Sequence, residues 1–356
     1  MNCNILIGKG LRDKCMIDSW LMSAYINIIG KCNFRCVYCS ADDIMAKSTT
    51  MTVEDIKKII IMLKGKHVCR INVTGGEPFL HEYIEEIIQI LIRDFSVSLL
   101  TNGTLITKHS QFLSKMPKKQ RVHFLVSLDA SSQRLNGLTR DDESFLEVID
   151  GIKFLVKQGF DVNIMCTLTK YNSREDEILN LVKLAKKLRV NHVGFFPLQP
   201  AGLGKKVFEY LRPDKDCLEK LLQKLPQISA EYQINLGLGY EKCYDEKLQG
   251  GARTLLPCKA GITQISIHNN GDVFPCNTLN LLMGNIFESS LDYILNESEG
   301  AKKIRLLSKS TMVRNPLCRD CKYINNCNGG CRAIAYGYSG DLYAPSYYCG
   351  QCGDSL

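Results

Sequence analysis

The stretch Lys31-Cys32-Asn33-Phe34-Arg35-Cys36-Val37-Tyr38-Cys39 decides how the rest of this chain is interpreted. Its cysteines are spaced C-x3-C-x2-C and follow an apolar run, residues 24–29, which is typical of a buried strand ended by Gly30. Three thiolates on one short loop can bind three irons of a 4Fe-4S cluster, which leaves the fourth iron without a nearby protein ligand. An iron with an open position is a reaction site, by the logic of catalytic zinc sites. The spacing alone leaves a zinc site short of one ligand, or three unrelated thiols, as alternatives.

Length and composition limit the class of protein. The chain has 356 residues, 45% hydrophobic and 23% charged, which is enough for one large domain and a smaller one. No run of about 18 apolar residues occurs, and residues 1–14 lack the core of a secretory signal. Seventeen cysteines without an export signal favour metal ligation in a reducing compartment, so we expect a cytoplasmic protein without a membrane partner. The net charge of +8 indicates a surface rich in lysine, and the lysine runs are too short to predict nucleic-acid binding.

Residues 24–198 alternate strand and helix patterns. Thr52 reads as a helix N-cap with Asp55 three residues later, and Cys69 and Cys166 fall inside predicted strands, where we expect them in the core. Alternation of this length predicts parallel strands joined by right-handed crossovers, and six such units can form an open, partial barrel. Active sites of parallel barrels lie at the C-terminal ends of the strands. The predicted strands are residues 24–29, 68–74, 97–101, 122–129, 161–169 and 192–198.

The C-terminal part has a different character, because eight of the 17 cysteines lie from Cys258 onward. Residues 214–225 read as a helix, and residues 262–267 alternate before Asn269-Asn270-Gly271-Asp272, which is a hairpin signal. Residues 290–295 and 302–307 look helical, and the remainder is irregular, as expected where metal sites replace a core. The expected divisions are an N-terminal extension (1–23), a partial barrel (24–212), a helical bridge (213–257) and a cysteine-rich domain (258–356).

Several polar motifs follow the predicted strands. In Gly75-Gly76-Glu77-Pro78 the glycines let the backbone approach a ligand, and Glu77 can accept hydrogen bonds from an ammonium group, although a plain strand-to-helix turn is the alternative. Thr101-Asn102-Gly103 reads as a turn. Asp129 ends the fourth predicted strand and Arg140 lies beyond it, and the two would be worth little as a surface ion pair.

Taken together, the cysteine loop, with Tyr38 before its third cysteine, and the following Gly75-Gly76-Glu77-Pro78 resemble the radical S-adenosylmethionine (radical SAM) superfamily. The resemblance extends over about residues 24–349 and implies a (β/α)6 partial barrel. It also implies a 4Fe-4S cluster on Cys32, Cys36 and Cys39, with SAM at the open iron and its methionyl amine held by Glu77 and the glycine backbone. The residues that it suggests for the SAM pocket are Tyr38, Gly75, Gly76, Glu77, Pro78, Asn102, Ser127 and Arg140.

An ordered string of cysteines forms the second motif. Cys258-x12-Gly271-x4-Cys276 is followed by Cys318-x2-Cys321-x5-Cys327-x3-Cys331 and then by Cys349. Taken alone, the four cysteines from Cys318 suit a zinc site. The whole string resembles the SPASM domain of radical SAM enzymes that modify peptides and proteins, which implies two auxiliary 4Fe-4S clusters and three clusters in all. One would use Cys318, Cys321, Cys327 and Cys349, and the other Cys258, Cys276 and Cys331, with Cys243, Cys352 or an open position as the fourth ligand.

The resemblance implies an enzyme that cleaves SAM to a 5′-deoxyadenosyl radical and modifies a ribosomally made peptide or protein. The expected product is a thioether, a carbon–carbon crosslink or a related oxidation, and the expected electron donor is a flavodoxin or ferredoxin. Because 31 residues precede Cys32, we expect no added N-terminal peptide-binding domain, so a leader peptide would need a separate binding protein or the barrel surface.

Three alternatives remain at this point. Anaerobic sulfatase-maturating enzymes are similar but typically carry aspartate after the cysteine matching Cys276, where this chain has Asn277, which cannot act as a base. An enzyme acting on a small molecule or haem precursor would have the same domains. A non-enzymatic zinc-binding adaptor is the alternative from another class, and a brown or colourless purified protein would distinguish iron–sulfur from zinc.

Overall fold

A ten-stranded sheet runs through the computed structural model, which describes residues 21–46, 49–117, 119–140, 143–238, 258–321, 324–327 and 329–349. Every pairing from β8 to β7 is parallel, whereas β9 pairs antiparallel with β8 and β10. In spatial order the strands are β10 (Gly284–Asn285), β9 (Asp272–Phe274), β8 (Gln264–Ile267), β1 (Ser23–Ile29), β2 (Arg70–Gly75), β3 (Ser96–Thr101), β4 (Val122–Ser127), β5 (Asp161–Leu168), β6 (His192–Pro197) and β7 (Asn235–Leu238). Because β10 and β7 are both edges, the barrel is open.

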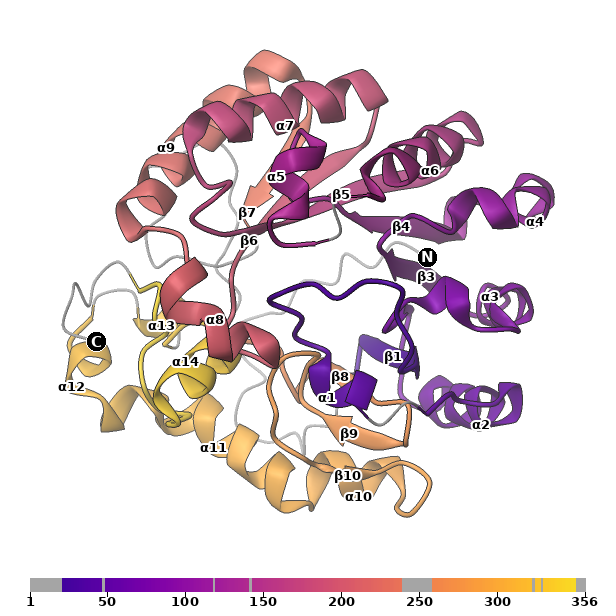
Figure 1. The fold of residues 1–356 in the computed structure, drawn as a ribbon. Helices are drawn as coiled ribbons and strands as arrows, with labels where there is room; N and C mark the ends of the chain where they lie inside the picture. Colours follow the sequence, from indigo (N-terminus) through magenta and orange to yellow (C-terminus); the bar gives the residue numbers. More distant parts are fainter. Residues whose placement is uncertain are drawn as a thin grey trace.

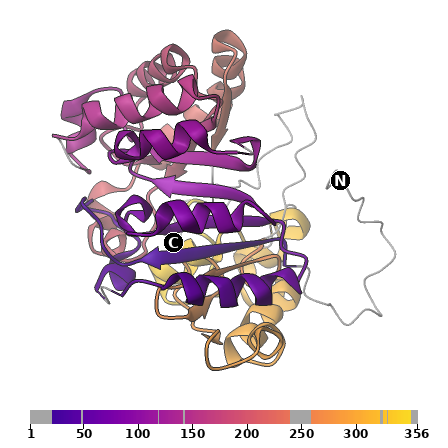
Figure 2. The ribbon, with the colours of Figure 1, turned by 90° about the vertical axis from the view of Figure 1, so that its right-hand side faces the viewer.

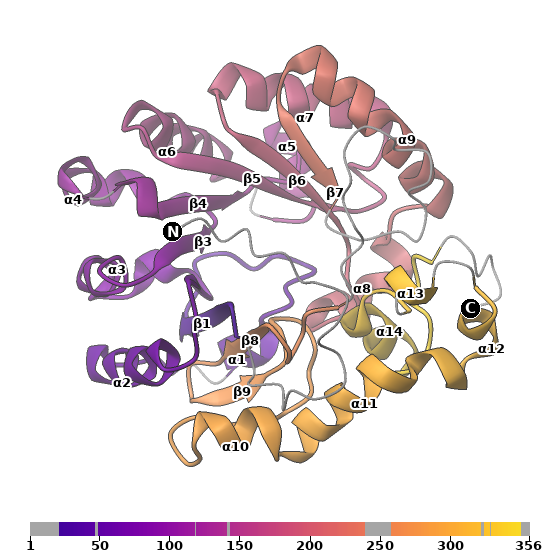
Figure 3. The same cartoon turned by 180° about the vertical axis from the view of Figure 1, so that it is seen from behind.

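Helices cover the outer side of this curved sheet (Figures 1 and 3). In the view turned by 90°, the helices that follow the first strands lie roughly parallel to one another along that side (Figure 2). The covering helices are α2 (Val53–Lys64), α3 (Ile84–Leu91), α4 (Ser110–Lys115), α6 (Phe145–Lys157), α7 (Glu175–Leu188) and α9 (Lys215–Tyr232). The other helices are α1 (Asp42–Ala46), α5 (Gln133–Gly137), α8 (Leu203–Leu211), α10 (Leu291–Asn296), α11 (Glu299–Arg314), α12 (Pro316–Arg319), α13 (Ile324–Cys327) and α14 (Arg332–Ser339), with 3-10 turns η1 (Pro78–Leu80), η2 (Ile106–His109) and η3 (Lys119–Arg121).

The two faces of the sheet differ in chemistry. Alternate residues of a strand point to opposite faces, and one set is apolar and fully buried, for example Ile26, Val73 and Val97. These residues form one core with the apolar stripes of the helices. The other set is polar although it is also buried, for example Asn27 on β1 and Ser266 on β8. Both faces of a parallel sheet are usually apolar. A polar inner face therefore indicates that the inside of the barrel is a site rather than a core.

The expected α/β architecture, with an open barrel of parallel strands, is confirmed. Thr52 caps α2 in a capping box with Asp55, as its spacing predicts. The helix predicted over residues 214–225 continues past Pro226 to Tyr232. Proline removes one backbone hydrogen bond, but Leu225 and Ile228 on either side are buried, and that packing keeps the helix intact. Beyond α9 the chain forms β7, a further parallel strand that no sequence pattern indicated.

One expectation about the core is wrong. Cys166 is fully buried within β5, as predicted, but Cys69 is exposed. The strand that was expected to contain Cys69 begins one residue later, at Arg70, so the thiol lies at the strand's entrance and donates to the carbonyl of Met22 over 3.3 Å. The predicted strand began at Val68 because that residue is apolar, whereas the observed strand begins at Arg70.

The C-terminal part is joined to the barrel in two places. The predicted hairpin forms between β8 and β9, with Gly271 at φ +90°, and β8 pairs with β1. At the other edge, the ring of Phe208 on α8 packs against Tyr347 and Tyr348, and the Tyr348 hydroxyl donates to the Leu198 carbonyl over 2.7 Å. In Figure 1, α8 and α14 lie across the open side of the barrel. The cysteine-rich part therefore continues the sheet and also lies across its opening.

Among the described residues, none of the helices combines the length and the apolar character needed to cross a bilayer.

Candidate active site

The three-cysteine loop leaves the C-terminal end of β1 and is fixed at both ends. The Val37 amide donates to the Thr139 carbonyl over 3.0 Å, and the Asn33 amide group donates to the Thr104 hydroxyl over 3.0 Å. Burial raises the pKa of the Cys32 and Cys36 thiols to about 11 each, and the other thiols of the loop contribute to the increase. Burial also raises the pKa of Cys39. Three half-buried thiols on one loop are a donor set that an iron–sulfur cluster would stabilise in the thiolate form.

The glycines after β2 bring this strand end against the cysteine loop. The Gly76 amide donates to the Ile29 carbonyl over 2.7 Å, and the Glu77 amide donates to the Lys31 carbonyl over 2.8 Å. A Cβ on Gly75 would lie 2.3 Å from the Ile29 oxygen, and one on Gly76 would lie 2.0 Å from the Lys31 oxygen. The close approach predicted for these glycines is therefore made to the chain itself, and it sets Glu77 beside Cys32. Pro78 then begins the 3-10 turn η1.

The Glu77 carboxylate is 1% exposed and accepts three hydrogen bonds from the chain. One oxygen accepts from the Thr101 hydroxyl and the Phe79 amide, whereas the other accepts only from the Asn102 amide, over 2.8 Å. Burial raises the pKa of Glu77 to about 7, against the lowering effect of these donors. No lysine, arginine or histidine of the described residues pairs with it. A buried carboxylate with acceptor capacity left and no cation fits an ammonium group such as the SAM amine.

Asn102 connects the end of β3 to the cysteine loop. Its side-chain amide donates to the Asn33 carbonyl oxygen over 2.8 Å, and its own oxygen accepts from Thr104. The backbone amide of Asn102 also donates a hydrogen bond to Glu77, so both the backbone amide and the side chain of Asn102 are engaged in contacts within the protein. Ser127, the last residue of β4, is half-buried on the inner face of the barrel.

Tyr38 and Arg140 meet at Asp129. The Arg140 Nε donates to the Asp129 carboxylate over 2.8 Å, and the Tyr38 hydroxyl bonds to the same oxygen. Both charged side chains are buried, at 9% and 1% exposure, so this is not the surface pair considered from the sequence. Arg140 also approaches the Cys36 sulfur at 3.9 Å. A buried guanidinium at a cluster ligand can neutralise part of the negative charge that a cluster brings.

The structure sorts the C-terminal cysteines into two groups. Burial raises the pKa of Cys331 to about 12, and the next causes are the charges of Cys258 and Cys276. For Cys318, burial raises the pKa to about 11, followed by the charges of Cys349, Cys327 and Cys321. The thiols that influence one another's pKa in this way belong to the same two sets that the resemblance implies, and the binding of a cluster by each set stays a prediction. Among the described residues, no group of three or more His, Cys, Asp or Glu side chains is placed to hold a metal ion.

Arg332, which the sequence analysis did not single out, lies between these groups. It is 3% exposed, and its guanidinium donates to the carbonyls of Gly329, Gly330, Leu342 and Ala344. Burial lowers its pKa, and thiols from both groups oppose that shift. The sequence signal that could have indicated Arg332 is its position directly after Cys331, a predicted cluster ligand. Asn27, polar within an otherwise apolar run, was a similar signal: it is fully buried and bonds to Ser266 and Asn277.

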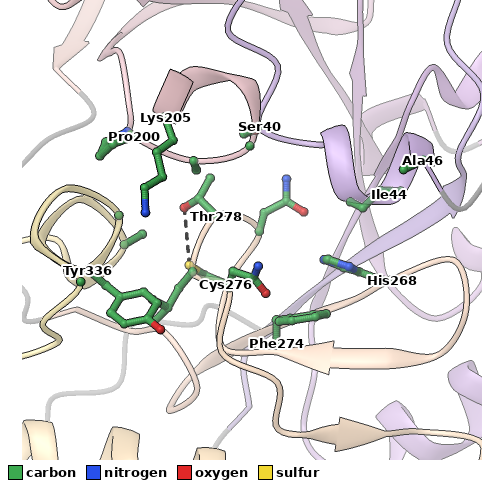
Figure 4. A pocket seen from close by; sticks show the side chains of 18 residues that line it. Ser40, Ile44, Ala46, Pro200, Lys205, His268, Phe274, Cys276, Thr278 and Tyr336 are labelled. Atoms are coloured by element: carbon green, nitrogen blue, oxygen red, sulfur yellow. Dashed lines mark hydrogen bonds between the residues drawn. The ribbon is translucent and has the colours of Figure 1, made fainter. Parts of the chain in front are cut away.

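A cavity of about 680 Å³ lies between the cysteine loop and the C-terminal part (Figure 4). It is lined by Ser40 and Ile44 after the cysteine loop, by Lys205 on α8, by Cys276 and by Tyr336 on α14. It therefore connects the loop that carries Cys39 with a predicted ligand of the second cysteine group. A substrate in this space would lie between the two.

Comparison with protein families agrees with this arrangement. The profile of the radical SAM superfamily matches residues 26–185, and that of SPASM, described as an iron-sulfur cluster-binding domain, matches residues 258–322. The chain is a radical SAM enzyme with a SPASM domain. As such it uses iron–sulfur clusters and SAM, and similar solved structures contain bound S-adenosylmethionine.

Curated relatives of this radical SAM enzyme differ in their described activities. A probable GTP 3′,8-cyclase of Saccharolobus islandicus is 29% identical over 62% of this chain and 70% of its own length. The antilisterial bacteriocin subtilosin biosynthesis protein AlbA of Bacillus subtilis is 26% identical over 77% of this chain and 59% of its own length. An AdoMet-dependent heme synthase of Methanosarcina barkeri is 28% identical over 89% of this chain and 93% of its own length. The chain thus spans less than two thirds of AlbA.

Two solved structures share the fold of this radical SAM enzyme over 93% of the chain. SuiB of Streptococcus suis, bound to the precursor peptide SuiA, has a TM-score of 0.72 with 19% identity and is covered over 76% of its length. Native anSMEcpe with bound AdoMet has a TM-score of 0.69 with 22% identity and is covered over 94% of its length. At these identities the likeness establishes the fold alone.

Proposed function

We propose that this radical SAM enzyme modifies a ribosomally made peptide or protein, forming a thioether, a carbon–carbon crosslink or a related oxidised residue. The observation that supports this most is the extent of the fold shared with SuiB, which covers both the barrel and the cysteine-rich part and which is described with a bound precursor peptide. The described role of AlbA in bacteriocin biosynthesis points in the same direction.

In this proposal Cys32, Cys36 and Cys39 bind the first of three 4Fe-4S clusters, and SAM binds at its open iron. When bound and reduced, this group supplies a 5′-deoxyadenosyl radical that removes a hydrogen atom from the substrate. Glu77 accepts the SAM amine with its oxygen that has capacity left, and Asn102 keeps the Glu77 carboxylate in position. Gly75, Gly76 and Pro78 place Glu77, and the half-buried Ser127 contacts SAM from the inner face of the barrel.

Arg140 and Tyr38 act from the other side of the loop. Arg140 is placed by Asp129, and this buried pair keeps a positive charge at Cys36. We propose that Arg140 faces the SAM carboxylate and that Tyr38 supports it through the shared Asp129 oxygen. The surrounding barrel orients the reacting groups and excludes water.

The two cysteine groups would bind the auxiliary clusters, and the electron donor would be a flavodoxin or ferredoxin. We assign Cys318, Cys321, Cys327 and Cys349 to one cluster and Cys258, Cys276 and Cys331 to the other. The latter keeps an open iron in this proposal. Cys243 and Cys352, the other candidates for its fourth ligand, lie outside the described residues.

Maturation of a sulfatase is less well supported, because Asn277 stands where an aspartate base is expected. The Asn277 oxygen accepts from Ser266 over 3.2 Å and from Asn27 over 3.3 Å. A carboxamide held by two donors does not take up a proton near pH 7.

A haem-precursor substrate is the second candidate, favoured by the match to the heme synthase over nearly all of both chains. The two functions are distinguished by mass spectrometry of a precursor peptide co-expressed with this protein, in parallel with anaerobic incubation with a tetrapyrrole precursor. A mass change in the peptide that requires Cys32 supports the proposal. Conversion of the tetrapyrrole with an unchanged peptide would assign the second function instead.

A further inference from the structure

The cavity beside Cys276 has a consistent electrostatic character. Among its described lining residues Lys205 is the only one with a permanently charged side chain, and no aspartate or glutamate is present. Lys205 makes no ion pair with any described acidic residue, and its side chain extends from α8 into the cavity (Figure 4). Lys205 lines a space of about 680 Å³, which is large enough for part of a substrate.

Asn277 adds a hydrogen-bond donor to the same cavity. Its oxygen is already occupied by Ser266 and Asn27, over 3.2 and 3.3 Å. These contacts fix the orientation of the carboxamide, so that its NH2 group is the part available to a ligand. The fully buried Asn27 and Ser266 come from β1 and β8, which hold this arrangement rigidly.

The remaining polar groups of the lining do not reverse this character. Ser40 and Tyr336 contribute hydroxyl groups, and Thr278 shares its hydroxyl with the Cys276 sulfur at 3.7 Å. The His268 ring packs against Phe274 with ring centroids 4.2 Å apart and the planes tilted by 30°. The described lining therefore offers one cation, the carboxamides of Asn277 and Asn280, the His268 imidazole and neutral hydroxyls, and it contains no carboxylate; Cys276 would add negative charge there only as a thiolate ligand of a cluster.

We propose that this cavity binds a carboxylate of the peptide substrate, with Lys205 as its counter-ion and the Asn277 amide group as a second donor. The carboxylate is an aspartate or glutamate side chain near the modified residue, or the peptide's own C-terminus. The inference rests on the proposed function and deepens it, because it states which chemical group places the substrate between the cysteine loop and Cys276. Lys205 is thus a specificity-determining residue.

The experiment uses the full-length, anaerobically reconstituted protein with SAM. A displayed library of random decapeptides is selected on the wild type and on the Lys205→Met, Lys205→Arg and Lys206→Met variants. Lys206 is the matched control, because it is the adjacent exposed lysine of α8 but does not line the cavity. We expect the wild type, Lys205→Arg and Lys206→Met to enrich acidic residues or a free terminus. The Lys205→Met variant should lose that enrichment.

One selected peptide is then synthesised with its acidic residue changed to the amide, and separately with an amidated C-terminus. Fluorescence anisotropy should show binding to the wild type weakened about tenfold by one of these changes, a loss of about 1.4 kcal/mol. The change that weakens binding identifies the source of the carboxylate. The same change should have no effect on binding to Lys205→Met.

The proposal is overturned if the wild type selects no peptides, if selected peptides show no carboxylate preference, or if the preference survives in Lys205→Met. These outcomes differ from failure of the proposed function itself, which is measured by the mass of the co-expressed precursor peptide. Production of 5′-deoxyadenosine from SAM alone should be equal in all four proteins, which shows that each variant is folded and carries its first cluster.

Discussion

The cysteine loop at residues 32–39 and the cysteine-rich part from Cys258 to Cys349 present the same thiol groups on very different supports. The loop begins at the end of a central strand, and the sheet beneath it packs on an extensive apolar core. Among the described residues, the separate core cluster near the C-terminal cysteines has three buried members, Leu279, Ile304 and Ala333, and the helices that carry Cys318 and Cys327 are short. We therefore expect the fold to support the first site, and the second site to depend more on the clusters that we propose for it.

The largest effect should come from the first site, as a loss of chemistry without a loss of structure. Replacing Cys32, Cys36 and Cys39 by alanine should abolish 5′-deoxyadenosine formation from SAM. Because the barrel core supports the loop, the melting temperature and the auxiliary iron should remain near those of the parent. Product analysis, iron content and thermal melting test this together. Full turnover by the triple variant would contradict the proposed role of the loop.

Loss of thiols from the second site should instead unfold its surroundings. Cys318→Ala and Cys349→Ala should each lose about four irons, one cluster's worth. Hydrogen exchange should then rise across residues 316–349 but not in strands β1 to β6, because structural metal sites contribute about 10 kcal/mol or more to small domains. Cys217→Ala, a half-buried cysteine of α9 without a predicted ligand role, is the matched control. Equal exchange in parent and variants would show that the C-terminal part is held by its own packing.

Arg332 sharpens the comparison because it supports the second site without being a ligand. Arg332→Met should leave the carbonyls of Leu342 and Ala344 without their guanidinium donor, whereas Gly329 keeps its bond from the Ser346 amide, and should cost about 3 kcal/mol in unfolding free energy. Denaturation followed by an optical signal of the auxiliary clusters measures this cost. Arg319→Met, which removes an exposed arginine paired with Asp320, should cause no measurable change. A similar free energy of unfolding for the two variants would show that Arg332 does not stabilise the second site.

Glu77→Gln should give the smallest of these effects and should confine it to the first site. The amide keeps the shape and can still accept from Asn102, but it loses the charge that attracts the SAM amine. SAM affinity should fall about ten- to hundred-fold, and iron content should not change. Equilibrium binding of SAM provides the measurement, with Glu86→Gln on the exposed face of α3 as control. Unchanged SAM affinity would show that Gly75-Gly76-Glu77-Pro78 is only a turn that positions the backbone.

Local sequence patterns predicted the parallel strands and the order of the motifs well, because burial periodicity and cap residues act over a few positions. They began the strand of Cys69 two residues too early, at Val68 instead of Arg70. They also ended the helix over residues 214–225 before Pro226, where packing of Leu225 and Ile228 overrides the local signal. They also missed β7, since a short strand of half-buried residues has no distinctive pattern.

The sequence by itself determined which residues carry the chemistry: the spacing of Cys32, Cys36 and Cys39 and of the C-terminal cysteines is a local property of the chain. Only the tertiary structure decided what surrounds them. Glu77 reaches the cysteine loop because β2 pairs with β1, Arg140 is paired with the buried Asp129 two residues beyond the end of β4, and Lys205 and Asn277 line one cavity. Contacts between residues 70 to 240 positions apart depend on how the sheet closes, and no local pattern encodes that closure.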